Sequence, residues 1–339
     1  MLVKLEPLGR DRKDMPMHPS RRAVVGAIAM LPGIRVAHTQ EAYPSRPITV
    51  VTGAPAGGLT DVSTRAITER MGAVLGQTIV VENRTGGAAA IAPTYVTQAR
   101  PDGYTLLGGT SSLAINPALQ PSLTPRHPRQ ELLPIGFNFR SPFVLHIHPS
   151  LPIHSVADLI AYAKANPGRL NFGSSGAGAV NHLALELLAQ RTGIEVLHVP
   201  YRGGVPALID LRQNRIQAMF QSALEAIPVV REGATRAIAV SGLERIVPLP
   251  EIPPVADTVP GFEAVFWQGL FAPIGTPGVI VERLAAALGT ATDDPALRSR
   301  MAEQGVAVQT GDASYLARVL EEDTATWGRL IREANIQPS

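Results

Sequence analysis

Cysteine is absent from the 339 residues of this chain. Its absence excludes disulfide bonds, thiolate metal ligands, cysteine nucleophiles and a lipid-modified N-terminal cysteine. Charged residues are also few, at 17%, whereas hydrophobic residues make up 45%. That apolar fraction is typical of a globular protein, and the length allows one large domain or two ordinary ones.

The body of the chain lacks an excess of positive charge. The formal net charge is +2, but residues 1–42 alone carry a net charge of +3, and the remainder carries −1. A protein that neutralises phosphates needs a basic tract on its surface. We therefore expect no nucleic-acid partner.

Residues 1–42 have the pattern of a signal peptide or leader. Arg21 and Arg22 precede an apolar run at residues 23–34. A membrane-spanning helix needs about 20 apolar residues, so this run is too short to serve as one. A basic segment followed by a short apolar segment is typical of export signals, and the paired arginines also resemble a twin-arginine signal. We expect a periplasmic protein, exported by the Sec or the twin-arginine route, whose mature chain starts between residues 37 and 43.

Short β-branched runs alternate with helical patterns after residue 43. Strands are predicted at residues 47–51, 78–82 and 104–108. The first intervening helix is expected to start with Thr60 or Asp61 as its N-cap and to stop at Gly76. This βαβαβ order favours a parallel sheet with helices on both faces.

A second α/β series follows a proline-rich stretch at residues 117–134. It is expected to begin with a strand at residues 143–147 and a helix that Ser155 caps. Further strands are predicted at residues 171–174, 196–199, 218–220 and 237–240. Two α/β lobes with a crevice between them are the predicted architecture, and such crevices bind ligands at the carboxyl ends of strands.

Two glycine-rich loops follow predicted strands and precede predicted helices. One contains Gly57 and Gly58, and the other has the sequence GSSGAG at residues 173–178. Glycine lets a backbone approach a ligand closely, and N–H groups at a helix start favour an anion. Neither loop matches the dinucleotide or P-loop motifs. One such loop in each lobe suits a small carboxylate held between the lobes.

Catalytic and metal-binding patterns are weak in this chain. His146 and His148 would share one face of a strand, but no acid or third histidine is near them in sequence. We expect no metal and no cofactor. No G-x-S-x-G elbow occurs, although Ser174 or His182 could act in an α/β hydrolase, because fold alone does not exclude catalysis. Trp267 is expected in the core rather than at the ligand.

Many short motifs, in order, resemble one family of binding proteins. The chain resembles the extracytoplasmic receptors of tripartite tricarboxylate transporters, the Bug family, from Tyr43 to about Ile336. The motifs that carry the resemblance are YPSRPI (43–48), PAGGLTD (55–61), VENR (81–84) with GG (86–87), PDGYTL (101–106), NP (116–117), HPSLP (148–152), NFGSSG (171–176), HVPYRGG (198–204) and WQGLFAP (267–273).

The resemblance implies a two-lobed periplasmic binding protein of the α/β Venus-flytrap type (type II-like), each lobe a sheet flanked by helices. It implies that residues 43–142 plus 264–339 form lobe 1 and that residues 143–263 form lobe 2. It further implies a small carboxylate ligand that the two glycine-rich loops hold. The ligand-binding residues expected on this basis are Ala56, Gly57, Gly58, Asp61, Thr110, Ser111, Ser174, Ser175, Gly176, Gly178, His182, Tyr201 and Gln221.

Two positions depart from the family pattern. Ala56 stands where the family usually has a proline directly before Gly-Gly, and Gln221 stands where it often has an aspartate. An aspartate would attract an ammonium group, whereas a neutral amide does not. We expect Gln221, just after the predicted strand, to face the crevice, and the ligand to lack an α-amino group.

Three functions agree with this sequence to different degrees. The family resemblance implies a monomeric receptor that delivers its ligand to the membrane permease subunits of a tripartite transporter and that is not an enzyme. A hydrolytic enzyme on a similar scaffold is the first alternative. A sensor that reports its ligand to a signalling partner is the second.

Overall fold

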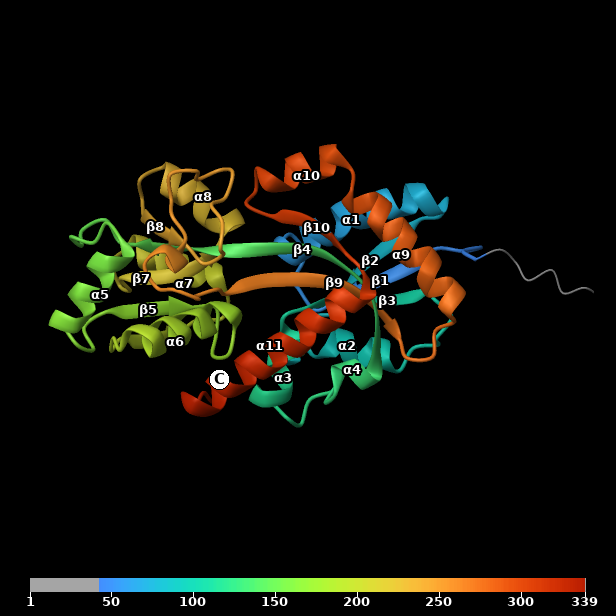
Figure 1. The fold of residues 1–339 in the computed structure, drawn as a ribbon, viewed down its shortest axis with the longest axis horizontal. Coiled ribbons are helices and arrows are strands. Elements are labelled where there is room, and N and C mark those ends of the chain that lie inside the picture. The colour runs from blue at the N-terminus through green and yellow to red at the C-terminus, as the bar shows by residue number, and fades with distance from the viewer. Residues whose placement is uncertain (1–42, 339) are drawn as a thin grey trace, which may run out of the picture. The chain divides into compact units, whose positions relative to one another are not determined.

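The computed structural model of the protein describes residues 43–338, so the predicted signal peptide at residues 1–42 lies outside the described residues (Figure 1). The first half of the described chain contains β1 (Ile48–Thr52), α1 (Leu59–Leu75), β2 (Ile79–Asn83), η1 (Gly87–Ala89), α2 (Ile91–Thr97), β3 (Thr105–Thr110), α3 (Ser112–Leu119), α4 (Pro128–Glu131), β4 (Leu132–Ile147), α5 (Val156–Ala165), β5 (Asn171–Ser174) and α6 (Val180–Thr192). The second half contains β6 (Leu197–Pro200), α7 (Gly204–Arg212), β7 (Ala218–Ser222), α8 (Ala223–Arg231), β8 (Arg236–Val240), η2 (Val255–Asp257), β9 (Val265–Pro273), α9 (Gly278–Thr292), α10 (Pro295–Ala302), β10 (Ala307–Gly311) and α11 (Ala313–Glu333).

The strands follow the order β2-β1-β3-β9-β4-β7-β5-β6, and β8 and β10 both pair with β4. β1 is parallel to β2 and β3, and β5 is parallel to β6 and β7, as the alternation of strands and helices predicts. The strands between these two parallel groups pair antiparallel. The fold is therefore the expected α/β architecture of two lobes, each with a sheet flanked by helices (Figure 1).

One long strand, β4, joins the two parts of the sheet. Residues 132–142 pair with β9 and β10, and residues 143–147 pair with β7 and β8. The prediction that this strand starts at Phe143 is wrong, because it already starts at Leu132. Pro134 lies at a shift in the β4–β9 register, and such irregularities tolerate a residue without an N–H group.

Local signals set several helix ends. Gly76 adopts a left-handed φ of 69° and closes α1, and the Ser155 hydroxyl accepts the Asp158 N–H at the start of α5, as predicted. The predicted N-cap of α1 is wrong by two or three residues. The cap is Gly58, and Thr60 and Asp61 lie inside the first turn.

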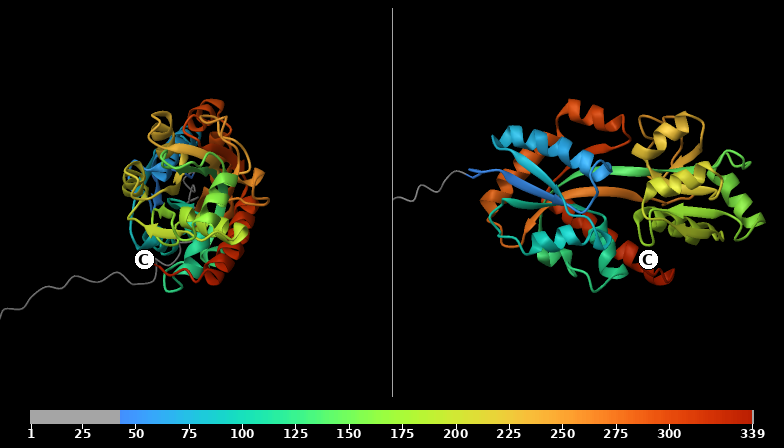
Figure 2. Two further views of the ribbon diagram at one scale, coloured as in Figure 1. Left: turned by 90° about the vertical axis from the view of Figure 1, so that its left-hand side faces the viewer. Right: turned by 180° about the vertical axis from the view of Figure 1, so that it is seen from behind.

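The core extends into the C-terminal helix. Trp267 in β9 is only 1% exposed, and its indole N–H donates to Asp323 of α11 at 2.6 Å, which confirms that Trp267 is a core residue. Burial raises the pKa of Asp323, although the hydrogen bond from Trp267 opposes the rise. Helix α11 packs on α3 and reaches α6, where Glu333 accepts from Gln190 (Figures 1 and 2). No helix among residues 43–338 is both long and apolar enough to span a bilayer.

Candidate functional site

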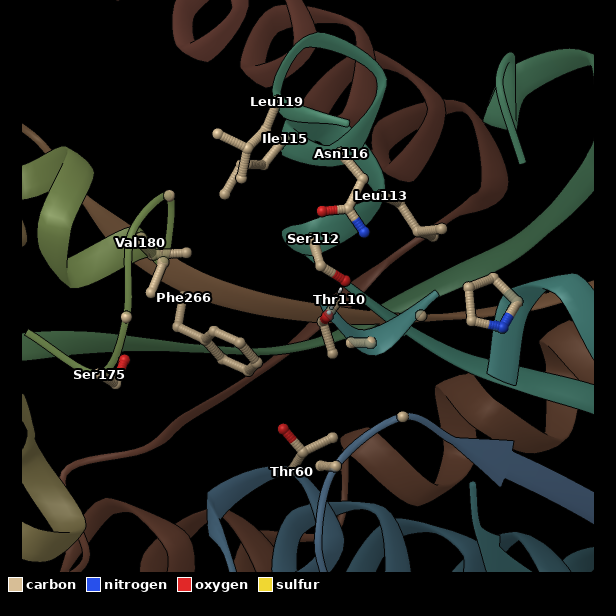
Figure 3. A pocket seen from close by; sticks show the side chains of 18 of the residues that line it. Thr60, Thr110, Ser112, Leu113, Ile115, Asn116, Leu119, Ser175, Val180 and Phe266 are labelled. Carbon is tan, nitrogen blue, oxygen red and sulfur yellow. Dashed lines mark hydrogen bonds between the residues drawn. The ribbon is translucent and has the colours of Figure 1, made fainter. Parts of the chain in front are cut away.

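A cavity of about 710 Å³ lies where loops from both parts of the sheet meet (Figure 3). Its walls come from the β1–α1 loop, the end of β3 with α3, and the β5–α6 loop. None of the described residues that line it carries a charged side chain. They are Gly53, Ala54, Pro55, Thr60, Gly87, Ala89, Pro93, Leu107, Gly108, Gly109, Thr110, Ser112, Leu113, Ile115, Asn116, Leu119, Gln120, Phe143, Ser175, Gly176, Ala177, Gly178, Ala179, Val180, Asn181 and Phe266.

Three helices begin at this cavity. Thr60 is the second residue of α1, Ser112 is the first residue of α3, and Val180 is the first residue of α6, and all three line the wall. The first N–H groups of a helix have no partner within the helix, and the helix dipole makes that end positive. Three such ends around an uncharged cavity produce a positive potential without a buried cation.

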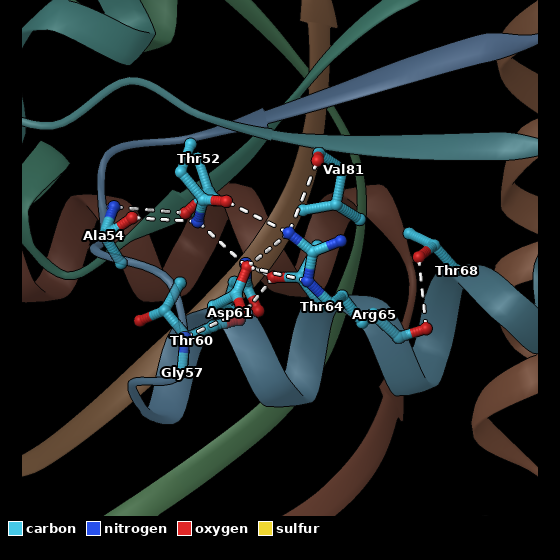
Figure 4. A network of polar contacts seen from close by, with 11 residues as sticks. Thr52, Ala54, Gly57, Thr60, Asp61, Thr64, Arg65, Thr68 and Val81 are labelled. Carbon is cyan, nitrogen blue, oxygen red and sulfur yellow. Dashed lines mark hydrogen bonds and ion pairs between the residues drawn. The ribbon is translucent and has the colours of Figure 1, made fainter.

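The β1–α1 loop is held by a buried carboxylate (Figure 4). Asp61 Oδ2 accepts the Gly57 N–H at 2.9 Å, and Oδ1 accepts from Arg65 at 3.0 Å and from Asn83 at 2.9 Å. Burial alone would raise the pKa of Asp61, but the hydrogen bonds from Arg65, Gly57 and Asn83 outweigh burial and lower it. Asp61 therefore stays charged and fixes the loop from behind, while its ion pair with Arg65 compensates its charge.

The β5–α6 loop is held by side chains behind it. Asn181 Oδ1 accepts the Ser175 hydroxyl at 2.9 Å, and the Asn181 amide donates to the Phe220 carbonyl at 3.1 Å. The Ser174 hydroxyl oxygen accepts the Gly176 N–H at 3.2 Å. These bonds fix the Ser175–Gly176 backbone at the cavity wall.

Two stacked histidines support the same loop. The Gly178 N–H donates to His182 Nδ1 at 2.9 Å, which places the His182 proton on Nε2, facing Glu186 at 3.2 Å. The His198 ring stacks on His182 with centroids 3.6 Å apart. Burial, and then the proximity of His182, lower the pKa of His198 to about 4. The loop is thus supported by a neutral imidazole pair.

The expected site residues fall into two groups. Thr110, Ser175, Gly176 and Gly178 line the cavity. The others are not among the lining residues. Ala56, Gly57 and Gly58 form the turn between Pro55 and Thr60. The buried residues are Asp61, Ser111, Ser174, His182 and Gln221, and Tyr201 donates to Asp210.

Gln221 lies inside β7 rather than after it, and it is 2% exposed. Its side-chain amide packs directly against Gly204 at the start of α7, since a Cβ at Gly204 would come within 2.6 Å of it. Among residues 43–338, its Nε2 atom has no hydrogen-bond partner. Its expected effect on ligand choice stays a prediction.

Sequence reasoning missed much of the α3 wall. Ser112, Ile115, Asn116 and Leu119 all line the cavity, although residues 116–117 entered only as a family motif. The usable signal was the small polar pair Ser111-Ser112, which follows the predicted strand at residues 104–108 after two residues and is typical of a helix start. Phe266 also lines the cavity, and no local pattern distinguishes it from its buried neighbour Trp267.

Two of the candidates for other chemistry, Ser174 and His146, are fully buried. Ser174 Oγ lies 2.6 Å from His198 Nε2 but is fully buried and does not line the cavity. His146 is also fully buried, with Nδ1 bonded to Thr235 at 3.0 Å. Within the part of the chain that the structure describes, no three histidine or acidic side chains gather as a metal site would require.

Comparison with known proteins identifies the family. The family model for tripartite tricarboxylate transporter family receptors matches residues 63–336. The protein BugT of Bordetella pertussis is 32% identical over 92% of this chain and 96% of its own length. Two solved structures are similar to this chain. Rpa4515 of R. palustris with adipate is 33% identical, with a TM-score of 0.78 over 88% of this chain and 100% of that chain. MatC of Rhodopseudomonas palustris with bound malate is 31% identical, with a TM-score of 0.74 over 85% of this chain and 100% of that chain. The chain belongs to the solute-binding receptors of the tripartite tricarboxylate transporter family, whose members are periplasmic.

Proposed function

We propose that this receptor binds a small carboxylate in the cavity between the β1–α1, β3–α3 and β5–α6 loops. The observation that carries the proposal is the convergence of the α1, α3 and α6 N-termini on a cavity without a charged side chain among its described lining residues. Backbone N–H groups at helix starts are suited to bind an anion. The carboxylates named for the two solved relatives, adipate and malate, support the same ligand class.

A thermal-shift screen tests this function. Mono-, di- and tricarboxylates are compared with the corresponding neutral primary amides, which keep the shape and lose the charge. A ligand that binds only the folded state raises the free energy of unfolding, by about 2.7 kcal/mol at one hundred times its Kd. The melting temperature rises as a result. At least one acid should stabilise the protein while its amide does not. Equal shifts for acid and amide, or no shift with any acid, would contradict the proposal.

The proposed lobes are residues 43–142 plus 264–339 and residues 143–263. The pairing of β4 supports this division, since its partners change between Pro142 and Phe143. On the return path, β9 starts at Val265 and pairs with Pro142. Ligand contacts from both lobes would then favour a closed state, because only that state offers both sets of contacts.

The receptor releases its ligand unchanged, as a monomer, to the permease subunits of a tripartite transporter. The buried position of Ser174 supports the absence of hydrolysis. Nuclear magnetic resonance of a bound ester or acid after long incubation checks this, because an enzyme would produce new signals. Light scattering of the purified protein checks the monomer.

Export through residues 1–42 is the proposed route to the periplasm. The Arg21-Arg22 pair and the apolar run at residues 23–34 support it. Mass spectrometry of the periplasmic fraction should find a chain that starts between residues 37 and 43. An intact N-terminus, or protein found only in the cytoplasm, would contradict export.

A further inference from the structure

The cavity has an apolar end. Ile115 and Leu119 of α3, Val180 of α6 and Phe266 of β9 line it. In the view of Figure 3, Ile115, Leu119 and Val180 lie together at one end, and Thr60 lies at the other. Apolar ligand surface that contacts such a wall is removed from water, which favours binding roughly in proportion to the area buried.

The polar end of the cavity offers a small set of hydrogen-bonding groups. Thr110 and Ser112 hydroxyls lie 2.9 Å apart, beside the start of α3, and Thr60 lies at the start of α1. Asn181 is already used, since it accepts from Ser175 and donates to Phe220. One carboxylate can therefore be held by the helix starts and the hydroxyls at this end.

None of the described residues that line the apolar end carries a cation that could pair with a second carboxylate. The nearby Arg65 side chain is bonded to Asp61 and Asn83 behind the β1–α1 loop, and Arg84 is bonded to Glu82 and covers the Tyr95 ring. An ionised carboxylate that loses water against leucine, isoleucine and valine side chains pays a large desolvation penalty. The side chains at this end therefore favour an apolar group over a second carboxylate, although Val180 also begins α6 and Asn116 lies beside Ile115 (Figure 3).

We infer that the ligand is an amphipathic monocarboxylate, with one carboxylate at the Thr60–Thr110–Ser112 end and a hydrocarbon body, linear or cyclic, against Ile115, Leu119, Val180 and Phe266. The volume of about 710 Å³ lies in the range of sites for drug-sized molecules and accommodates a body of six or more carbon atoms. This inference rests on the proposed carboxylate-binding function and narrows its ligand class.

Hexanoate and adipate form a matched pair for the test. Both have six carbons, and they differ only in the group at the far end, a methyl or a second carboxylate. Calorimetry on the wild-type protein at constant ionic strength should give an affinity for hexanoate at least tenfold higher than for adipate. Cyclohexanecarboxylate should also bind more tightly than adipate. Malate, which has no hydrocarbon body, should bind most weakly.

A cation at the apolar end should reverse this preference. Leu119 is the last residue of α3, a position that favours positive charge, so Leu119→Lys places an ammonium group there. The variant should bind adipate at least tenfold more tightly relative to hexanoate than the wild type does. Leu119→Met keeps the volume without the charge and should retain the wild-type preference. The wild-type comparison stands by itself if Leu119→Lys does not fold.

The outcomes separate the inference from the function on which it rests. If adipate or malate binds wild-type protein as tightly as hexanoate or more tightly, the inference is wrong and the carboxylate receptor stands. If none of the acids binds, while neutral molecules do, the proposed function itself is wrong and the inference falls with it.

Discussion

Charge in this protein is placed one layer behind the binding surface. Asp61 carries a full negative charge, yet it is 4% exposed and its oxygens are occupied by Gly57, Arg65 and Asn83. Its expected contact with the ligand stays a prediction, and in the structure its bonds hold the loop that surrounds the cavity. A carboxylate facing the cavity would have repelled the proposed ligand.

Asp61→Asn should loosen the β1–α1 loop. The neutral amide cannot accept all three hydrogen bonds, so the free energy of unfolding at pH 7 should fall by about 1–2 kcal/mol. Because the pKa of Asp61 is lowered in the folded protein, its contribution is present at neutral pH and is lost as the pH falls below about 3.8 toward that lowered value. Urea unfolding at pH 7 measures the loss. The control is Glu69→Gln at an exposed position of the same helix, and an equal loss in both variants would contradict the role of Asp61.

Single residues also show where sequence reasoning ends. The composition of the loops indicated an anion site, and Ser175, Gly176 and Gly178 do line the cavity. In the other loop the wall is formed by Gly53, Ala54 and Pro55, and Gly57 and Gly58 are not among the lining residues. Which side of a turn faces a cavity depends on long-range bonds such as Gly57 to Asp61 and Asn83 to Ala54, and no local pattern contains them.

At the scale of elements, β4 connects the two parts of the sheet and buries a histidine. It pairs with four other strands, and His146 lies within it with no exposure to solvent. Burial lowers the pKa of His146 to about 3. Its Nδ1 atom bonds Thr235, and among residues 43–338 no group bonds Nε2. The strand therefore requires a neutral imidazole.

His146→Gln should make stability less sensitive to acid. In the unfolded chain a histidine takes up a proton near pH 6.5, whereas buried His146 does not until about pH 3, so stability is lost as the pH falls below 6.5. Between pH 7.5 and 4.5 this amounts to about 2–3 kcal/mol. The wild type should lose that much more than His146→Gln in urea unfolding at the two pH values. His148→Gln, at a partly exposed position on the same chain segment, should behave as wild type; equal losses in all three proteins would contradict the account.

Elements with compact local signals could be predicted, and those that depend on distant partners could not. The alternation around β1, α1 and β2, the Gly76 stop and the Ser155 cap follow from local sequence. The first eleven residues of β4 could not be predicted, because Pro134 and Pro142 suggest a loop. They form a strand because β9 and β10 pair with them. Helix α3 was hidden for a similar reason, since it contains Pro117.

At the scale of the whole binding protein, a close contact joins two walls of the cavity. Leu119 of α3 lies over Gly178 of the β5–α6 loop so closely that a Cβ at Gly178 would come within 2.1 Å of Leu119 Cδ2. Gly178 also has a φ of 76°, which favours glycine. The close approach of the two proposed lobes therefore requires glycine, which has no side chain, at residue 178.

Gly178→Ala should hold the two walls apart. The added methyl group meets Leu119, so ligand affinity should fall at least about tenfold, or about 1.4 kcal/mol. Leu119→Ala in the same chain removes the clash and should restore part of that loss, while the backbone strain at residue 178 remains. Calorimetry on both variants measures this. A double variant no better than Gly178→Ala would indicate that backbone strain alone is responsible.

The central claim is that a carboxylate binds at the helix starts around this cavity, and Ser112 tests it most directly. Ser112→Asp places a negative charge at the first residue of α3, where it stabilises the helix but occupies the anion site; Ser112→Asn has nearly the same shape without the charge. Calorimetry with hexanoate or adipate, whichever the wild type binds more tightly, should show a loss of at least about thirtyfold, or about 2 kcal/mol, for Ser112→Asp at an unchanged or raised melting temperature. Ser112→Asn should lose far less. Wild-type affinity in a folded Ser112→Asp protein would contradict the claim.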